Sequence, residues 1–331
     1  MKKILLLFSV LVLAAIARGE THGYLSFHFA KGQEESGLSQ GTFQSPLLGL
    51  FFSGDLTPRL AYISEIGFRD DSRLEIEQAL LGIRLAESFT LNLGLYLVPF
   101  GKYNVSHRPH QTALIKTPLH VESLYPSRWR DVGVIVEGKT GGFFYSAYLG
   151  NGLTEAENLS RSQQFTDHNK DKGKGGRVGL FLGRGLEAAF SYYRGKYDED
   201  NERALSLKGA DLSLISGGIQ ILSEYAVADV ENPAPYAKGK AEGYFVQVSI
   251  DIEAIRPVAS YQRLKYRDPF HGTGFAEGIP EGIDEEKNRW TFGLVYFASS
   301  NVLFKAEYEL NREREAKLRN DIFLIQMALH F

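Results

Sequence analysis

The sequence predicts an all-β fold, a transmembrane antiparallel β-barrel of about 16 strands with a long third outward loop folded into the pore. Three observations lead to this prediction. Apolar residues recur at every second position, the segments with this period are long for β-strands, and short and long connections alternate between them. Because a soluble sandwich also alternates apolar and polar residues, the lengths of the segments and connections carry the distinction.

Residues 1–19 precede the predicted barrel and have the pattern of a secretory signal peptide. Lys2 and Lys3 come before an apolar run over 4–16, and the small residues Ala17 and Gly19 offer a cleavage site. The apolar run is short for a helix that crosses a bilayer, which needs about 20 residues. We expect a signal peptide at 1–19 and one barrel domain at 20–331, with an uncleaved anchor as the alternative.

The composition excludes several classes of protein. The chain contains no cysteine, which rules out disulfide bonds and thiolate metal sites. Its formal net charge is -3, whereas nucleic-acid binding usually needs a basic domain, so we expect no nucleic-acid partner. After residue 19 no stretch of about 18 uncharged apolar residues could cross a membrane as a helix.

The two-residue period is clear in the segment 301–312, where Val302, Phe304 and Tyr308 alternate with Lys305 and Glu307. Segments of this kind are longer than the usual strand of about 5–6 residues. Most reach the roughly 9–11 residues that a tilted membrane-spanning strand needs. The predicted strands are 22–31, 43–55, 59–69, 73–86, 89–99, 131–139, 142–150, 175–183, 186–196, 204–215, 218–229, 241–252, 255–267, 288–298, 301–312 and 319–331.

The connections alternate in length along the chain. The predicted short turns are 56–58, 87–88, 140–141, 184–185, 216–217, 253–254 and 299–300. The predicted outward loops are 32–42, 70–72, 100–130, 151–174, 197–203, 230–240, 268–287 and 313–318. Tight turns on one side and longer loops on the other are typical of barrels in the bacterial outer membrane. An even number of strands then places both termini on the periplasmic side.

The predicted last strand ends in an aromatic residue. Phe331, Leu329, Met327, Ile325 and Phe323 occupy every second position. A terminal aromatic residue on an alternating strand resembles the signal that the outer-membrane assembly machinery reads. We therefore expect this machinery to be a partner through Phe331.

The apolar faces are expected to contact outer-membrane lipid. In a bilayer every backbone N–H and C=O needs a partner within the protein, so a spanning sheet must close on itself. Phenylalanine and tyrosine are abundant enough to form aromatic girdles at the two membrane interfaces. Trp129 and Trp290 lie at or near predicted strand ends, where such girdles form.

The opposite faces of the strands should line a water-filled channel, since a barrel of this size is wider than its side chains can fill. This predicted pore wall is mixed in charge and leans acidic. Its residues are Glu65, Arg69, Arg73, Glu75, Glu77, Glu137, Lys139, Arg177, Glu187, Glu224, Asp251, Lys305, Glu307 and Glu309.

The loop 100–130 is the longest segment without a strand or helix period, and it is basic in an acidic chain. Charges act on a passing ion over about 8 Å at physiological salt, so bases at a constriction can dominate selectivity. We expect the loop to favour anions, with a solvated surface loop as the alternative. The predicted constriction residues are Lys102, His107, Arg108, His110, Lys116, His120, Arg128 and Arg130, against one acid, Glu122.

Three segments carry a family resemblance: GLYLVPFG at 94–101, RDVGV at 130–134 and YSAYLGNG at 145–152. In them the chain resembles the phosphate-selective porin O/P family of the outer-membrane porin superfamily. The resemblance implies a barrel of about 16 strands, a trimer, and a third loop folded inward. The best-known members line their pores with a ladder of arginines and a cluster of lysines, and no such ladder is present on the strands of this chain.

The sequence therefore predicts a porin for passive diffusion of small hydrophilic solutes, with anions preferred through loop 100–130. Two alternatives stay open: a substrate-specific, phosphate-like anion channel, and a plugged surface barrel that acts as an adhesin or receptor. We expect no enzyme activity and no cofactor. The three histidines of the loop and the acids of 268–287 lack the spacing of known metal sites, and we interpret them as polar loop residues.

Overall fold

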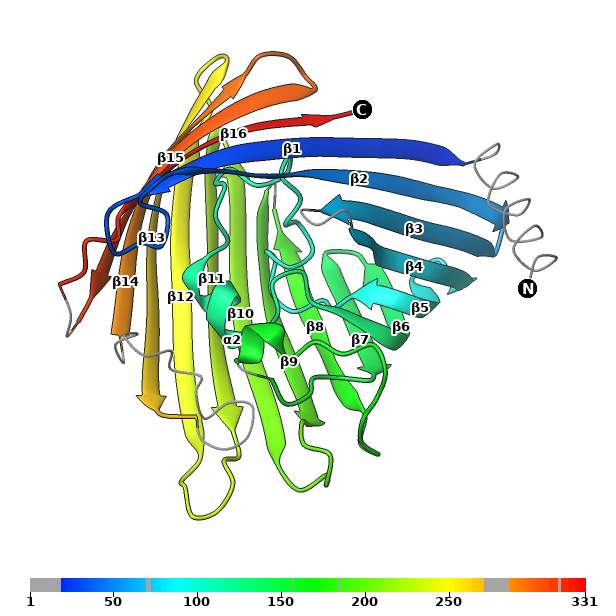
Figure 1. Cartoon of the computed structure of the whole chain (residues 1–331). Helices are drawn as coiled ribbons and strands as arrows, with labels where there is room; N and C mark the ends of the chain where they lie inside the picture. The colour runs from blue at the N-terminus through cyan, green and yellow to red at the C-terminus, as the bar shows by residue number, and fades with distance from the viewer. Residues whose placement is uncertain (1–18, 70–72, 157, 184, 271–285, 315–316) are drawn as a thin grey trace.

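The computed structural model describes residues 19–331 except 70–72, 157, 184, 271–285 and 315–316. The predicted signal peptide thus lies outside the described residues, apart from Gly19. Within the described part of the chain, each strand pairs antiparallel with its sequence neighbours, and β1 pairs with β16 to close a barrel of sixteen strands (Figure 1). The predicted all-β, closed antiparallel barrel and its strand number are confirmed.

The strands agree closely with the predicted segments, since no end differs by more than three residues. They are β1 Glu20–Gly32, β2 Thr42–Thr57, β3 Leu60–Arg69, β4 Arg73–Ala86, β5 Phe89–Leu97, β6 Arg130–Thr140, β7 Phe143–Gly150, β8 Gly173–Leu182, β9 Leu186–Lys196, β10 Ala204–Ser216, β11 Ile219–Val230, β12 Gly239–Ile250, β13 Ile255–Asp268, β14 Glu286–Phe297, β15 Val302–Glu313 and β16 Ile322–His330.

The alternation between an apolar and a polar face is present as predicted. On β15, Phe304 and Tyr308 are exposed on the outside, whereas Lys305, Glu307 and Glu309 are buried on the inside. The faces follow from strand geometry, which turns successive side chains to opposite sides. In the described residues, no helix is both long enough and apolar enough to span a membrane.

A β-bulge in β4 interrupts this pattern. Glu65 pairs with Gln78 but Ile66 pairs with Ile76, so one extra residue is inserted in β4. A bulge shifts the faces by one residue. Gln78 and Leu80 therefore line the interior, which the strict alternation of the sequence did not predict.

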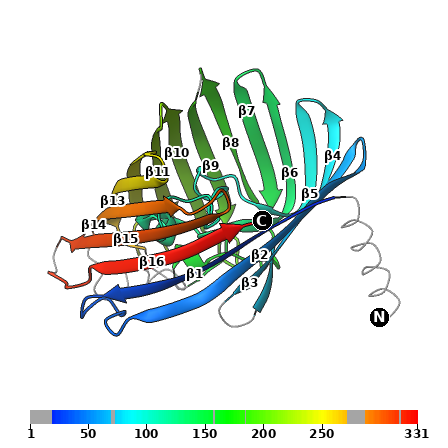
Figure 2. The ribbon, with the colours of Figure 1, turned by 90° about the horizontal axis from the view of Figure 1, so that it is seen from above.

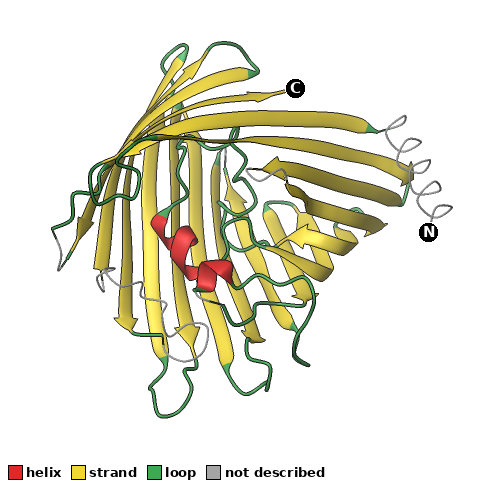
Figure 3. Ribbon diagram, viewed as in Figure 1, coloured by secondary structure: helices red, strands yellow, loops and turns green. Residues whose placement is uncertain are grey.

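The longest described connection joins β5 to β6 and covers residues 98–129, two residues earlier at its start than predicted. It contains the short helix α2 (Leu119–Leu124), and a 3-10 helix, η1 (Leu159–Arg161), lies in the connection between β7 and β8. Helix α2 contacts β11, β12 and β13. Figures 2 and 3 show this segment within the ring of strands.

A hydrophobic core fills one sector of the barrel interior. It joins loop residues such as Phe100, Tyr125 and Trp129 to inward residues of β5, β6, β7 and β9–β13, including Tyr193 and Leu205. Trp129 is fully buried and contacts Tyr193 at a centroid distance of 4.9 Å, so its predicted place in an interfacial girdle is wrong. Sequence periodicity could not separate a loop tryptophan in a core from one at a membrane interface.

Candidate functional site

The two ends of loop 98–129 are fastened together by Asn104. Its side-chain amide donates to the carbonyl oxygens of Val98 (2.7 Å) and Trp129 (3.0 Å), and its Oδ1 accepts from the Trp129 N–H (2.7 Å). Asn104 is fully buried. Buried polar groups stabilise a fold when their hydrogen bonds are satisfied, so the loop leaves and re-enters the sheet as a closed unit.

Glu224 of β11 anchors the start and the helix of the loop. Its carboxylate accepts from the backbone N–H groups of Lys102 (2.9 Å) and Tyr103 (3.0 Å) and from the Tyr125 hydroxyl, and it lies 3.0 Å from His120 Nε2. Burial and the Glu224 charge raise the pKa of Tyr125 well above its usual value, so this hydroxyl remains a donor.

Gly101 makes this anchor possible. Its φ is +68°, a conformation that glycine adopts without steric cost. A Cβ at this position would lie 2.3 Å from Glu224 Oε1. Any larger residue would therefore push the backbone N–H groups of the next two residues away from the carboxylate.

A second anchor lies on the opposite side of the barrel. Arg108 donates to both carboxylate oxygens of Glu65 on β3, with Nε 2.8 Å and Nη2 2.6 Å away. Tyr24 (3.0 Å) and Gln78 (2.9 Å) also donate to this carboxylate. In the closed strand order β3 and β11 are eight strands apart (11 − 3 = 8 of sixteen). The loop thus connects opposite walls.

The remaining predicted bases of the loop also pair with acids. Lys102 pairs with Glu187 of β9, and Lys116 Nζ lies 3.5 Å from Glu122 Oε1 within the loop. Arg128 (3.4 Å) and Arg130 (3.3 Å) both face Glu77 of β4, and Arg130 is the first residue of β6 instead of a loop residue. Although burial opposes it, the charge of Lys116 and then that of Arg289 hold the pKa of Glu122 below its usual value.

The loop turn 109–115 rests on β15. Lys305 Nζ donates to the carbonyl oxygen of Pro109 (2.7 Å) and to the Thr112 hydroxyl (3.1 Å), and Glu307 accepts from the Ile115 N–H. Glu309 lies 3.1 Å from Arg289 of β14. Lys305, Glu307 and Glu309 therefore point inward as predicted. Lys305 and Glu307 are covered by the loop and Glu309 is fully buried, so their prediction as water-exposed wall residues is corrected.

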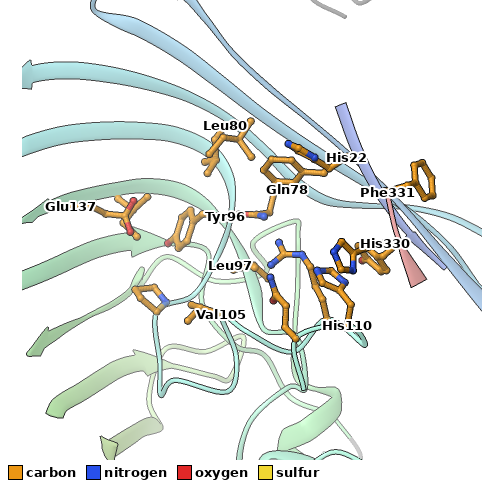
Figure 4. A pocket seen from close by; sticks show the side chains of 18 of the residues that line it. His22, Gln78, Leu80, Tyr96, Leu97, Val105, His110, Glu137, His330 and Phe331 are labelled. Carbon is orange, nitrogen blue, oxygen red and sulfur yellow. The ribbon is translucent and has the colours of Figure 1, made fainter. Parts of the chain in front are cut away.

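His110 packs at the edge of the open part of the interior. Its ring lies 5.0 Å from that of His330 on β16 and 5.4 Å from that of Tyr24, between centroids. Burial, followed by the charges of His330, Arg108 and Lys305, lowers the pKa of His110 to about 4. Figure 4 shows His110 and His330 side by side at one end of a cavity that His22 and Phe331 also line.

Cavities lie on both sides of the loop. A cavity of about 630 Å³ reaches from His22 and Phe331 at the periplasmic side to Arg108 and His110. A second, of about 630 Å³, shares Leu80 and Glu137 with it and extends to the turn between β4 and β5. On the outward side a cavity of about 350 Å³ borders the loop. Its lining includes His107, Lys116, Glu122 and Arg128.

Other predicted wall residues have mixed outcomes. Glu137 lines the periplasmic cavities and accepts from Asn92 (2.8 Å), and Lys139 Nζ lies 4.5 Å from the Phe181 ring centroid. Asp251 lies in the turn after β12, bonded to Arg256, and not on the wall. The side chains of Arg69 and Arg73 lie outside the described residues. Glu75, partly exposed, lies 3.6 Å from Arg130 Nη2.

His120 is the clearest correction among the predicted constriction residues. It is fully buried, stacks on Phe245 at 5.6 Å between centroids, and fits against Gly243, where a Cβ would lie 2.6 Å from the His120 Cβ. It belongs to the packed core and does not face water. Among the described residues no group of three or more histidines, cysteines or acids could hold a metal ion.

Comparison with known proteins identifies the family. A family model described as Gram-negative porin matches residues 85–316, more than two thirds of the chain. The chain belongs to the Gram-negative porin family. This porin is therefore a passive channel of the bacterial outer membrane for small hydrophilic solutes, and not an enzyme.

An uncharacterized protein of Aquifex aeolicus (strain VF5) is 23% identical over 314 residues, covering 83% of this chain and 71% of that protein. Three solved structures, each 13% identical, share the porin's fold over 95% of its length. They are an anion-selective porin from Comamonas acidovorans (TM-score 0.70, 99% of that chain), Salmonella typhi OmpF in complex with daunomycin (0.69, 97%) and the trimer form of OmpT from Vibrio cholerae (0.66, 99%).

Proposed function

We propose that loop 98–129 forms the constriction of this porin and gives it a weak preference for anions. The observation that carries the proposal is the anchoring of one loop to opposite walls, through Glu224 on β11 and Glu65 on β3. A solute that moves between the outward cavity and the periplasmic cavities must pass this loop. The passage between them is consequently narrower than the barrel itself.

The preference for anions rests on two ion pairs in which the side chain of the base is more exposed to water than that of the acid. The Lys102 side chain is 29% exposed against 10% for Glu187, and Arg128 is 27% exposed against 2% for Glu77. A passing ion meets the base before the acid behind it. Because each base is paired, the opposing charges largely cancel beyond about 8 Å. The expected selectivity is therefore anionic but small.

The test is a planar-bilayer recording of the refolded porin under a salt gradient. We expect open-channel steps and a reversal potential slightly on the anion side. In the variant Lys102→Gln, Lys116→Gln, Arg128→Gln the reversal potential should move toward cations. A clear cation preference of the unmodified porin would contradict the proposal, as would a triple variant with unchanged selectivity.

A phosphate-selective channel is the second candidate, as the sequence resemblance implies. The observation that favours it is the presence of Lys116, Arg128 and His107 around the same outward cavity of about 350 Å³. In such a channel, millimolar phosphate should block the chloride conductance. The conductance should also saturate as the salt concentration rises. A conductance that rises linearly with salt and ignores phosphate favours the general porin.

We also propose that this porin is a homotrimer and that the outer-membrane assembly machinery recognises Phe331. The OmpT structure with the same fold is a trimer, which supports the first proposal. Exposed Phe43, Phe68, Leu74 and Leu149 give β2, β3, β4 and β7 an apolar outer face up to their outward ends. Phe331 is 58% exposed beside β1. A monomeric mass in mild detergent, or normal assembly of Phe331→Ala, would contradict the respective proposal.

A further inference from the structure

The outward ends of β10–β13 carry charges on the face that elsewhere meets lipid. Lys208, Lys240 and Arg267 have side chains 62%, 43% and 54% exposed. The alternation of exposed and buried residues places them on the outside of the barrel. We call the following set the rim band: Lys208, Asp229, Lys240, Glu242, Arg263, Lys265, Arg267 and Glu286.

The rim band is continuous because the strand register brings its members together. Asp229 pairs with Lys240 across β11 and β12, and Lys265 pairs with both Glu242 and Glu286 on its two neighbours. On β8 and β9, Lys174 pairs with Arg194 and extends the row of bases. The charges therefore form one strip along the outer rim instead of isolated surface residues.

Bases outnumber acids in the rim band. Asp229 is shared by Lys208 (3.1 Å) and Lys240 (3.9 Å), and Glu286 is shared by Arg263 (2.8 Å) and Lys265 (3.8 Å). Five bases face three acids. If Lys174 and Arg194 are added together with Asp171 and Asp268 at the loop edge, seven bases still face five acids. Shared acids leave ammonium and guanidinium donors available for another anion.

A row of aromatic residues lies directly inside the rim band, toward the middle of the membrane. Tyr225 pairs with Tyr244, and Tyr261 pairs with Trp290 at a centroid distance of 4.8 Å. Aromatic girdles mark the interface between hydrocarbon and headgroups. Lys265 is four residues beyond Tyr261 on β13, about 13 Å along an extended strand. The rim band therefore lies at the level of the outer-leaflet headgroups.

We propose that the rim band binds phosphate-bearing lipids of the outer leaflet. Charged residues on a lipid-facing surface are costly in hydrocarbon but are stable among headgroups of opposite charge. Arginine and lysine are the side chains that bind phosphate best, arginine with two parallel hydrogen bonds. The opposite sector of the barrel, with Phe43, Phe68 and Leu74 at the corresponding outward positions of β2–β4, lacks this complementarity and is suited to protein contacts.

The test is a titration of the porin in mild detergent with diphosphorylated lipid A, followed by native mass spectrometry. The rim variant is Lys208→Gln, Lys240→Gln, Lys265→Gln, which keeps the Arg263–Glu286 and Arg267–Glu242 pairs. The matched control is Lys170→Gln, Lys172→Gln, Lys238→Gln, which removes the same charge from outward loops. Lys→Arg substitutions at the three rim positions restore the charge.

We expect the rim variant to bind lipid A about fivefold more weakly for each base removed, and the control and Lys→Arg variants to bind like the unmodified porin. Dephosphorylated lipid A should not distinguish the variants, and inorganic phosphate alone should show no saturable binding. Equal binding by the rim variant, or equal loss in the control, would overturn the proposal. So would a change of oligomeric mass without a change in lipid affinity, which would assign the band to a subunit contact. If the triple variant fails to fold, the single Lys208→Gln variant gives the same comparison.

Discussion

Two sectors of the barrel interior differ, although the same strand alternation builds both. On the side of β9–β13 the inward positions include glycine, alanine and leucine, such as Gly209, Ala226 and Leu205, and loop 98–129 packs on them as a hydrophobic core. On the side of β1–β5 the inward positions carry Glu65 and Gln78, and cavities remain. The small inward residues of β9–β13 leave room for the loop to pack against this wall, whereas on β3 the loop contacts the wall through the ion pair of Arg108 with Glu65.

The two sectors should respond differently to the loss of one carboxylate charge. Glu224→Gln leaves the four loop donors around it without a charged acceptor, and breaking a buried ionic network costs about 3–5 kcal/mol. Glu137→Gln in the open sector keeps its contact with Asn92 and should cost about 0.5 kcal/mol or less. Urea unfolding of the two variants measures the difference. Equal losses of unfolding free energy in the two variants would show that the packed sector does not depend more strongly on its carboxylate than the open sector does.

The turn 109–115 joins the two sectors, and Lys305 holds it. Lys305→Met removes the ammonium group that donates to both Pro109 and Thr112 while it keeps an apolar stem, and should cost about 1–3 kcal/mol. The released turn should raise current noise and open-channel conductance in bilayer recordings. Thr112→Val, which removes a single partner, is the matched control and should change both quantities less. A Lys305→Met channel with unchanged current noise and unchanged conductance would show that other contacts hold the turn in place.

Exposure should decide which base affects selectivity. Arg128 and Arg130 face the same acid, Glu77, but the Arg128 side chain is 27% exposed and that of Arg130 is 10% exposed. We expect Arg128→Gln to move the reversal potential toward cations, because its charge lies beside the outward cavity. Arg130→Gln should move it less and destabilise the barrel more. A larger shift of the reversal potential for Arg130→Gln than for Arg128→Gln would show that exposure does not decide the effect of a base on selectivity.

Lowering the pH should weaken the contact between the loop and the open sector. This effect should be smaller than those of the three sets of substitutions above. The pKa of His110 is lowered to about 4, whereas in the unfolded chain it is about 6.5. The unfolded state therefore binds more protons below pH 6.5, and the stability that neutral His110 contributes is lost as the pH falls from about 6.5 to 4. Current noise should increase over this range, and His110→Gln should abolish the increase.

Much of the candidate site could be predicted from the sequence, but its chemical environment could not. The bases of the loop and the acids of the wall were identified by residue, because charge and alternation are visible in the chain. Their pairing was not predicted, since Arg108 and Glu65 are 43 residues apart and meet only across the lumen. Tyr24, Gln78 and His330 were missed because a bulge and the barrel closure bring them to the site.

The sequence by itself determined the barrel, because a two-residue period and long segments leave a closed sheet as the structure that satisfies every backbone hydrogen bond in a membrane. It also determined which face of most strands points inward. Only the tertiary structure decided that one sector of the interior is packed, that His120 and Trp129 are buried and that each base of the loop has an acid partner. These features depend on contacts between residues far apart in the chain, which periodicity does not encode.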